Sequence, residues 1–200
     1  MRRSLFVIAV LSTLMPAAAL AAPEVSVTKV PLAEMTMNPD NALSQRPFEL
    51  EGKCMYWYRG LHMPAPFALT DATSSTTPAD NATIDGSEPP SWRFDLGRPA
   101  VERELRKIVV WWGLADPARC GINLKFQVHD FTTGEWRNAT DFVRQDLPRE
   151  EGMAGCLTLT FPEGEFKNFD SLRMIDGRRL FKAPGTRWIE VEAYTAPDNK

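Results

Sequence analysis

Apolar and polar residues alternate in several short segments of this chain, and this alternation restricts the fold more than any other feature. From residue 122 to residue 128, the even positions are apolar and the odd positions are polar. A period of two places the apolar side chains on one face of a β-strand. Such segments recur roughly every dozen residues with turn-forming residues between them, and we find no helical period of any length. The sequence therefore predicts an all-β, antiparallel sandwich.

Two of the expected strands are well defined by their residue types and their ends. Residues 105–113 are rich in β-branched and aromatic residues and end at a glycine, and their apolar run indicates burial on both faces. Apolar and polar residues alternate from 92 to 96. A turn is expected before this strand, at Asp85-Gly86, and the strand is expected to end at 97–99. Further strands are expected at 25–30, 47–50, 54–58, 67–75, 122–130, 135–143, 156–161, 169–175 and 188–194, with a hairpin turn at 133–134.

The N-terminal residues have the pattern of a secretory signal peptide. Two arginines precede a short apolar run, and Ala19-Leu20-Ala21 offers a cleavage site near Ala21. The apolar run is too short to span a membrane, and no later run is long enough. We therefore expect a secreted or periplasmic protein without membrane insertion. Its expected parts are a signal peptide (1–21), an irregular N-terminal arm (22–46), one β-sandwich (47–196) and a short tail (197–200).

The charge of the chain argues against two classes of partner. The formal net charge is −3, and loss of the signal segment would make it more negative because Arg2 and Arg3 would be removed. Nucleic acids and anionic membrane surfaces are bound through clusters of basic residues. We therefore expect neither nucleic acid nor a membrane surface as a partner.

The three cysteines are Cys54, Cys120 and Cys156. An oxidising destination predicts one disulfide and one remaining thiol, and the residues alone leave all three pairings open. No CxxC motif or Cys/His cluster indicates zinc.

The sequence lacks the common catalytic motifs. It has no GxSxG, no HExxH and no glycine-rich phosphate loop, and no two carboxylates stand in a recognisable catalytic context. We therefore expect a protein that is not an enzyme. His129 falls on the polar face of its strand and is expected to be solvated, whereas four tryptophans are expected in the core: Trp92, Trp111, Trp136 and Trp188.

Six motifs follow one another along the chain, at 81–86, 91–97, 107–111, 126–136, 171–174 and 189–192. In this order they resemble the discoidin, or coagulation-factor type C, domains, which include the galactose-binding modules of secreted glycosidases. The resemblance covers about residues 67–194. It implies an eight-stranded jelly-roll β-sandwich.

The resemblance also implies a structural calcium ion beneath the binding loops. Calcium takes six to eight oxygen ligands, many of them backbone carbonyls. The matching positions in this chain are Asp85, Ser87, Ser91 and Glu190. The alternative is that Asp85 and Ser91 only cap a turn. The topology of the family further implies a disulfide between Cys120 and Cys156, and it leaves Cys54 outside the matched region.

Two groups of residues are candidates for ligand binding. In the resembling family, ligands contact loops that correspond here to 114–119 and 76–80, which gives Trp112, Asp116 and Arg119 as candidates. Outside the matched region, an aromatic cluster with basic neighbours could pack against a sugar ring and bind its hydroxyls. That cluster contains Trp57, Tyr58 and Arg59, and the alternative is that Trp57 packs beneath the sandwich.

The resemblance leads to two hypotheses about function. The first is an exported, non-catalytic binding module for a carbohydrate or glycoconjugate, with a structural calcium. The second is a structural or protein-interaction domain of the cell envelope that has the same fold and an envelope protein as partner. Sequons at Asn81 and Asn138 matter only in a eukaryotic host.

Overall fold

The computed structural model describes residues 22–38, 40–51, 54–57, 70, 83–86, 89, 91–97, 103–115, 120–177 and 188–196, with side chains left out at 50, 54–57 and 83–86. Within these ranges almost all regular structure is β-strand. A 3-10 turn, η1, covers Leu32–Glu34. None of the described segments forms a helix of the length and hydropathy needed to cross a membrane.

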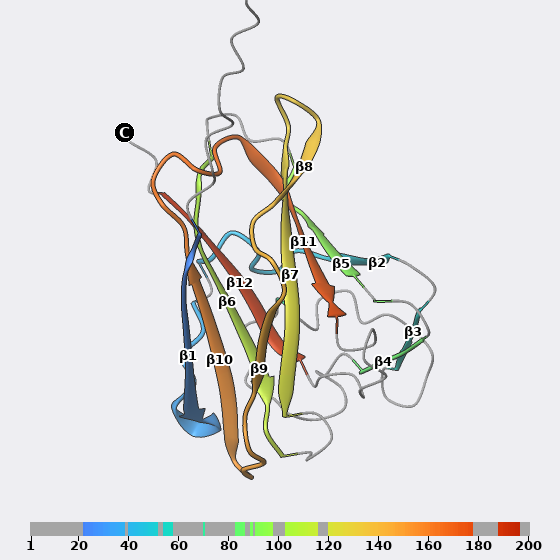
Figure 1. The fold of residues 1–200 in the computed structure, drawn as a ribbon, viewed down its shortest axis with the longest axis vertical. Coiled ribbons are helices and arrows are strands. Elements are labelled where there is room, and N and C mark those ends of the chain that lie inside the picture. The colour runs from blue at the N-terminus through green and yellow to red at the C-terminus, as the bar shows by residue number, and fades with distance from the viewer. Residues whose placement is uncertain are drawn as a thin grey trace, which may run out of the picture.

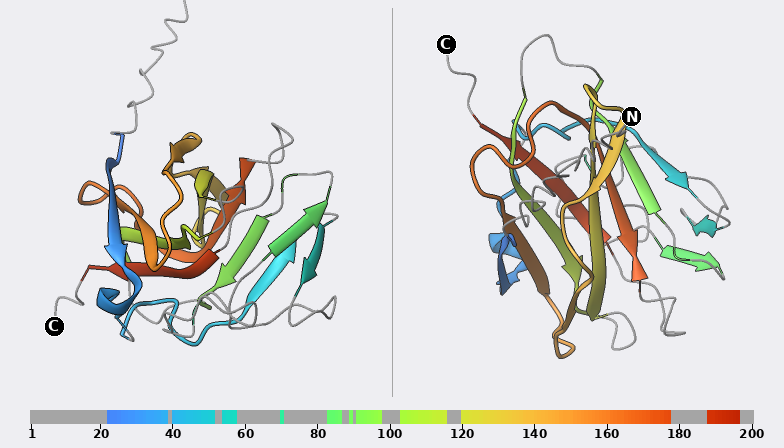
Figure 2. Two further views of the ribbon diagram at one scale, coloured as in Figure 1. Left: turned by 90° about the horizontal axis from the view of Figure 1, so that it is seen from below. Right: turned by 45° about the horizontal axis from the view of Figure 1, so that its top comes forward.

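Two antiparallel sheets form the body of the molecule, and they face each other as layers (Figures 1 and 2). The first sheet has the order β1 (Glu24–Pro31), β10 (Met153–Thr160), β6 (Leu105–Gly113) and β12 (Trp188–Thr195). The second sheet has the order β2 (Phe48–Glu51), β5 (Ser91–Asp95), β11 (Phe169–Asp176), β7 (Gly121–Asp130) and β8 (Glu135–Asn138). Strand β9 (Val143–Asp146) also pairs with β7, nearer the start of that strand. A separate ribbon pairs β3 (Cys54–Trp57) with β4 (Thr83–Gly86).

The hydrophobic core lies between the two sheets and consists of the inward residues of the alternating strands. In β7 these are the even positions, which are buried as the sequence predicted. Trp92 of the second sheet meets Trp188 of the first edge to face, with ring centroids 5.8 Å apart. Burial of each large apolar side chain contributes about 1.5–3 kcal/mol. The alternation is therefore what holds the two layers together, and the predicted all-β antiparallel jelly-roll sandwich is confirmed.

A second apolar cluster lies on the opposite, outward face of the first sheet. It contains Trp111 and Cys156, and residues of the N-terminal arm pack on it, among them Leu32, Met35 and Met37. Strand β6 is thus buried on both faces, as its apolar run indicated. The arm begins as β1, the edge strand that the alternation at 25–30 predicted, so the first sheet starts ahead of residue 47.

Two local predictions were wrong. Asp85 and Gly86 do not form a turn but lie in β4, where their backbones pair with Met55 and Cys54 of β3. A neighbouring extended segment supplies hydrogen-bond partners that a local turn signal does not reveal. The single strand expected at 135–143 is divided into β8 and β9. The strand expected at 67–75 lies outside the described residues, apart from Thr70.

The expected disulfide between Cys120 and Cys156 is not formed. Cys120 belongs to the core between the sheets, where its thiol donates to the Leu114 carbonyl at 3.3 Å. Cys156 belongs to the cluster on the outward face of the first sheet. In β10 the inward positions are taken by Leu157 and Leu159, so the period of two turns Cys156 away from Cys120.

Candidate functional site at the loop end of the second sheet

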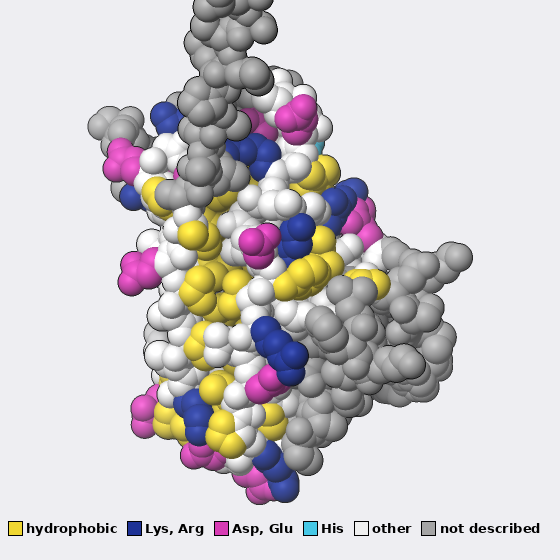
Figure 3. All heavy atoms as spheres, in the orientation of Figure 1, with side chains coloured by type: hydrophobic (Ala, Val, Ile, Leu, Met, Phe, Trp, Pro, Cys, Tyr) yellow, Lys and Arg dark blue, Asp and Glu magenta, His cyan; other side chains and the backbone are white. Residues whose placement is uncertain are grey.

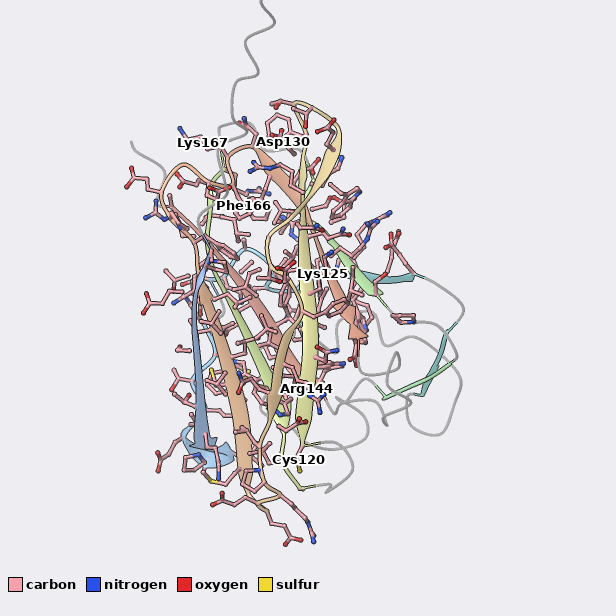
Figure 4. The ribbon with its side chains drawn as sticks, in the orientation of Figure 1. Cys120, Lys125, Asp130, Arg144, Phe166 and Lys167 are labelled. Atoms are coloured by element: carbon pink, nitrogen blue, oxygen red, sulfur yellow. The ribbon has the colours of Figure 1, made fainter. Side chains whose placement is uncertain are left out.

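At one end of the sandwich β6 and β11 end and β7 and β12 begin. Cys120 lies at this end, and Asp130, Phe166 and Lys167 lie at the opposite end (Figure 4). Lys125 and Arg144 are placed between the two ends, on the neighbouring strands β7 and β9. Around these two residues, on the solvent-facing side of the second sheet, we find the best candidate for a binding surface.

The segment between β8 and β9 determines the position of Phe142. The Ala139 N–H donates to the Phe126 carbonyl at 2.9 Å, and the Phe126 N–H donates to the Thr140 hydroxyl at 3.0 Å. Val143 then pairs with Leu124 and packs against the core. Because side chains alternate along an extended chain, Phe142 projects to the outer face.

The ring of Phe142 and the side-chain amide of Asn123 both lie against Gly177. A Cβ atom built on Gly177 would be 2.5 Å from Cε1 of Phe142 and 2.7 Å from Nδ2 of Asn123, so any larger residue at this position would have to displace these side chains. Asn123 is 4% exposed although it occupies an outward position on β7, while Phe142 remains 42% exposed. One side of the Phe142 ring therefore packs against the protein, and the other side is exposed to solvent.

Basic groups flank this ring. Lys125 follows Asn123 on the same face of β7, and no ion pair of Lys125 is found in the described part of the chain. Arg144 lies opposite Asn123 in the β7–β9 ladder, and its Nε donates to Asp146 at 3.0 Å. Its side chain is 64% exposed, and such surface pairs contribute about 0–1 kcal/mol. Hydrophobic surface is visible among the Lys and Arg side chains on this side of the molecule (Figure 3).

A second aromatic group lies further along β7. Trp136 of β8 pairs with His129, and their ring centroids are 5.2 Å apart. The guanidinium of Arg173 lies 4.0 Å from the centroid of the Trp136 ring. Arg173 also donates to Glu51 at 2.6 Å and to Gln127 at 3.1 Å. This network fixes the orientation of the polar side chains on the outer face of the second sheet.

Two expectations are corrected here. Trp136 is outside the core clusters and partly exposed, because it occupies an outward position on β8. His129 is not simply solvated, since its Nδ1 lies 2.6 Å from Oδ1 of Asp170 on β11. Both residues face outward, as the period of two requires. What the sequence could not show is that the neighbouring strands supply partners for them.

The ligand-binding residues expected from the sequence fall mostly outside the described residues. Trp112 is the exception: it is fully buried, and its indole N–H donates to the Cys120 carbonyl at 2.9 Å. It supports the β6–β7 connection from within the core and presents no ring to a ligand. The side chain of Trp57 in β3 is not described, and neither are Tyr58, Arg59, Asp116 and Arg119.

The expected calcium ligands are only partly described. Glu190 of β12 has a side chain that is 0% exposed, and a buried carboxylate suits a hard cation. The hydroxyl of Ser91 donates to Glu51 at 3.2 Å, on the outer face of the second sheet. Asp85 is described by its backbone alone, and Ser87 is not described. Within the described ranges, no three His, Cys, Asp or Glu side chains are grouped as metal ligands.

The sequence reasoning missed Phe142, Gly177 and Asn123. Phe142 fell near the end of a segment expected to be one strand. The signal that could have found it is the break in the alternation between Trp136 and Phe142, where polar residues occupy both even positions, Asn138 and Thr140. Such an interruption indicates a bulge or a break, and these re-aim side chains.

The described strands form a jelly-roll β-sandwich with the discoidin-like fold, and comparison with solved structures supports this. One similar structure is a mutant of the lectin binding domain of lectinolysin complexed with Lewis b, with a TM-score of 0.52 and 14% identity, covering 82% of this chain and 100% of that one. Another is a fucose binding module of Streptococcus pneumoniae, with a TM-score of 0.50 and 15% identity, covering 79% and 99%. At such low sequence identity, the structural similarity establishes the fold alone. A scan against protein-family models and a search of curated proteins each found no match.

Proposed function

We propose that this protein is a non-catalytic carbohydrate-binding module and that Phe142 is part of its binding surface. The observation that carries the proposal is the half-exposed Phe142 ring, which lies against Gly177, with Lys125 on the neighbouring strand β7. Sugars present C–H faces that pack on aromatic rings and hydroxyls that bond to nearby polar groups. A ring held next to a strand by hydrogen bonds of its own segment keeps its position before binding, so little ordering is needed when a ligand arrives.

The fold adds support to this proposal. One of the similar structures is a lectin domain in complex with Lewis b, and another is named as a fucose binding module. Fold similarity does not determine function, so the proposal depends on the residues of the site. Asp116 and Arg119 precede β7 in the sequence, and Trp57, Tyr58 and Arg59 remain proposed contributors from the aromatic segment.

A glycan array tests the proposal with three proteins. We expect the unmodified protein to bind a subset of glycans and Phe142→Ala to lose that binding. Val25→Ala is the matched control because Val25 is 43% exposed on β1, in the other sheet. No glycan binding over a broad array, or equal binding by all three proteins, would contradict the proposal. No glycan binding on the array, together with an envelope protein recovered by pull-down, would favour the hypothesis of an envelope protein-interaction domain.

We also propose a structural calcium ion. Glu190, Asp85 and Ser87 are its candidate ligands, whereas Ser91 would have to give up its hydrogen bond to Glu51 to take part with its hydroxyl. Calcium should raise the melting temperature of chelator-treated protein, and this rise should be lost in Glu190→Gln. A melting temperature that is unchanged by chelator and by added calcium would rule the ion out.

Export is the remaining part of the proposal and rests on the pattern at residues 1–21. Expression of the full chain in a host with a secretory pathway should yield protein outside the cytoplasm that begins at Ala22. Mass spectrometry of the N-terminus measures this. Recovery of only the uncleaved chain, inside the cell, would contradict it.

A further inference from the structure

We infer that the ligand is an acidic oligosaccharide that lies along β7 on the outer face of the second sheet, with Lys125 binding an anionic group on one of its sugars. This inference rests on the carbohydrate-binding function proposed above. It goes further because it names the charge of the ligand, the path it takes and the residue that selects it.

The outward residues of β7 define the path. Asn123, Lys125, Gln127 and His129 alternate with core residues and therefore lie in one row. At about 3.4 Å per residue, the row from Asn123 to His129 is about 20 Å long. Phe142 covers its first position, and Trp136 pairs with its last. A surface with an aromatic group at each end and polar groups between them suits several linked sugars better than one.

The middle of the row is fixed before any ligand arrives. The Gln127 side-chain amide donates to Asn138 at 3.0 Å and accepts from Arg173 at 3.1 Å. Arg173 in turn is held by Glu51 and by the Trp136 ring. Because these groups are already ordered, binding along the row costs little side-chain entropy.

The ion pairs on this face indicate that the ligand is negatively charged. Three carboxylates on the second sheet and β9 are already paired: Glu51 with Arg173 and Arg93, Asp170 with His129, and Asp146 with Arg144. Within the described residues, Lys125 is left without an ion pair in a chain whose net charge is −3. A carboxylate or sulfate on the sugar would supply the missing counter-charge, and charge-assisted hydrogen bonds are stronger than neutral ones.

Isothermal titration with defined oligosaccharides tests the inference. The probes are oligouronides of two to six sugars, sulfated oligosaccharides of matching length, and neutral oligosaccharides of the same lengths. We expect one of the acidic series to bind at least about tenfold more tightly than the neutral series. Affinity should rise with length until the row is filled, and it should fall as salt is added.

Three variants assign the roles of the residues. Lys125→Gln should remove the preference for acidic probes and leave neutral binding in place. Lys29→Gln, on β1 in the first sheet, is the charge control and should leave the preference unchanged. Trp136→Phe should flatten the dependence on length, and a melting curve of each variant confirms that it is folded.

The outcomes separate this inference from the function on which it rests. Equal affinity for acidic and neutral probes, or an unchanged acidic preference in Lys125→Gln, would overturn the inference and leave carbohydrate binding in place. Affinity that is independent of length would overturn the path along β7. Absence of all binding, with Phe142→Ala the same as the unmodified protein, would remove the proposed function itself.

Discussion

Phe142 and Gly177 belong to segments that are far apart in the sequence, yet the Phe142 ring occupies the space where a side chain of residue 177 would begin. A Cβ atom at residue 177 would lie 2.5 Å from Cε1 and 2.8 Å from Cδ1 of that ring. Gly177 follows β11 and Phe142 precedes β9, so the pair spans β7 and connects the three strands at the loop end of the sheet.

Gly177→Ala should therefore displace the ring and weaken sugar binding. Overpacking of a close contact costs about 1–3 kcal/mol of unfolding free energy. Urea unfolding and glycan titration measure the two effects. In the Phe142→Ala background the same substitution should cost less, because the ring that it displaces is gone. Equal costs in the two backgrounds would show that the ring is not what Gly177 accommodates.

Thr140→Val should destabilise the protein and disturb the site. The Thr140 hydroxyl accepts the Phe126 N–H in a buried position, and loss of that acceptor leaves a buried donor without a partner. The expected cost is about 1–3 kcal/mol by urea unfolding. Thr140→Ser keeps the hydroxyl and is the control. A Val variant as stable as the Ser variant would mean that this hydrogen bond does not fix the segment before Phe142.

Removal of the Arg173 guanidinium should loosen the outer face of the second sheet. Arg173→Met loses the ion pair with Glu51 and the stack on Trp136, both of them partly buried. We expect a loss of about 1–2 kcal/mol, and a change of Trp136 fluorescence in the folded state. The exposed pair of Arg144 and Asp146 serves for comparison, and Arg144→Gln should cost no more than about 0.5 kcal/mol. A reversed order would contradict the importance of the Arg173 network.

Cys156 should react slowly with iodoacetamide in the folded protein. Burial raises the pKa of its thiol, although hydroxyls of Thr158 and Thr28 act in the opposite direction. A raised pKa leaves less thiolate at neutral pH, and the thiolate is the nucleophile. The rate should increase with pH and should rise sharply when urea is added.

The same experiment tests the state of the cysteines. Without any reductant, mass spectrometry of unfolded, alkylated protein should show Cys120 and Cys156 both modified, since no bond joins them. Resistance of both residues to alkylation until a reductant is added would support the disulfide that the sequence suggested.

Stability should also decline in alkaline solution. Burial and the hydrogen bond to Glu192 raise the pKa of Tyr194, and burial raises that of Cys156. Both groups therefore keep their protons in the folded state at a pH where the unfolded chain releases them. Their stabilising effect is complete below their ordinary pKa values of 10.0 and 9.0 and is lost as the pH rises through the folded-state values. Tyr194→Phe should show a shallower decline of unfolding free energy with pH. An identical slope in the variant and the unmodified protein would show that Tyr194 does not contribute to the decline.

The strands were predictable because their signal is local. Ile122 to Val128 and the strand at 105–113 carry their own periodicity or residue types, and the hairpin at Thr133-Gly134 has its turn residues in place. Gly134 has a φ of +74°, a backbone conformation that glycine adopts freely.

What could not be predicted depends on partners distant in the sequence. The strand conformation of Asp85 and Gly86 needs β3 beside it, and the separation of the two cysteines depends on which face of β10 is inward. The candidate site also depends on residues that are distant in the sequence. Phe142 matters only because Gly177, which lies beyond the next three strands along the chain, leaves room for its ring.

The N-terminal arm gives the molecule two unequal sides. Leu32, Met35 and Met37 cover part of the outward face of the first sheet, whereas the outward face of the second sheet keeps its row along β7. Immobilisation or labelling chemistry directed to the arm would therefore leave the proposed glycan surface turned toward the solution, and glycan binding could be measured on a support without blocking that surface.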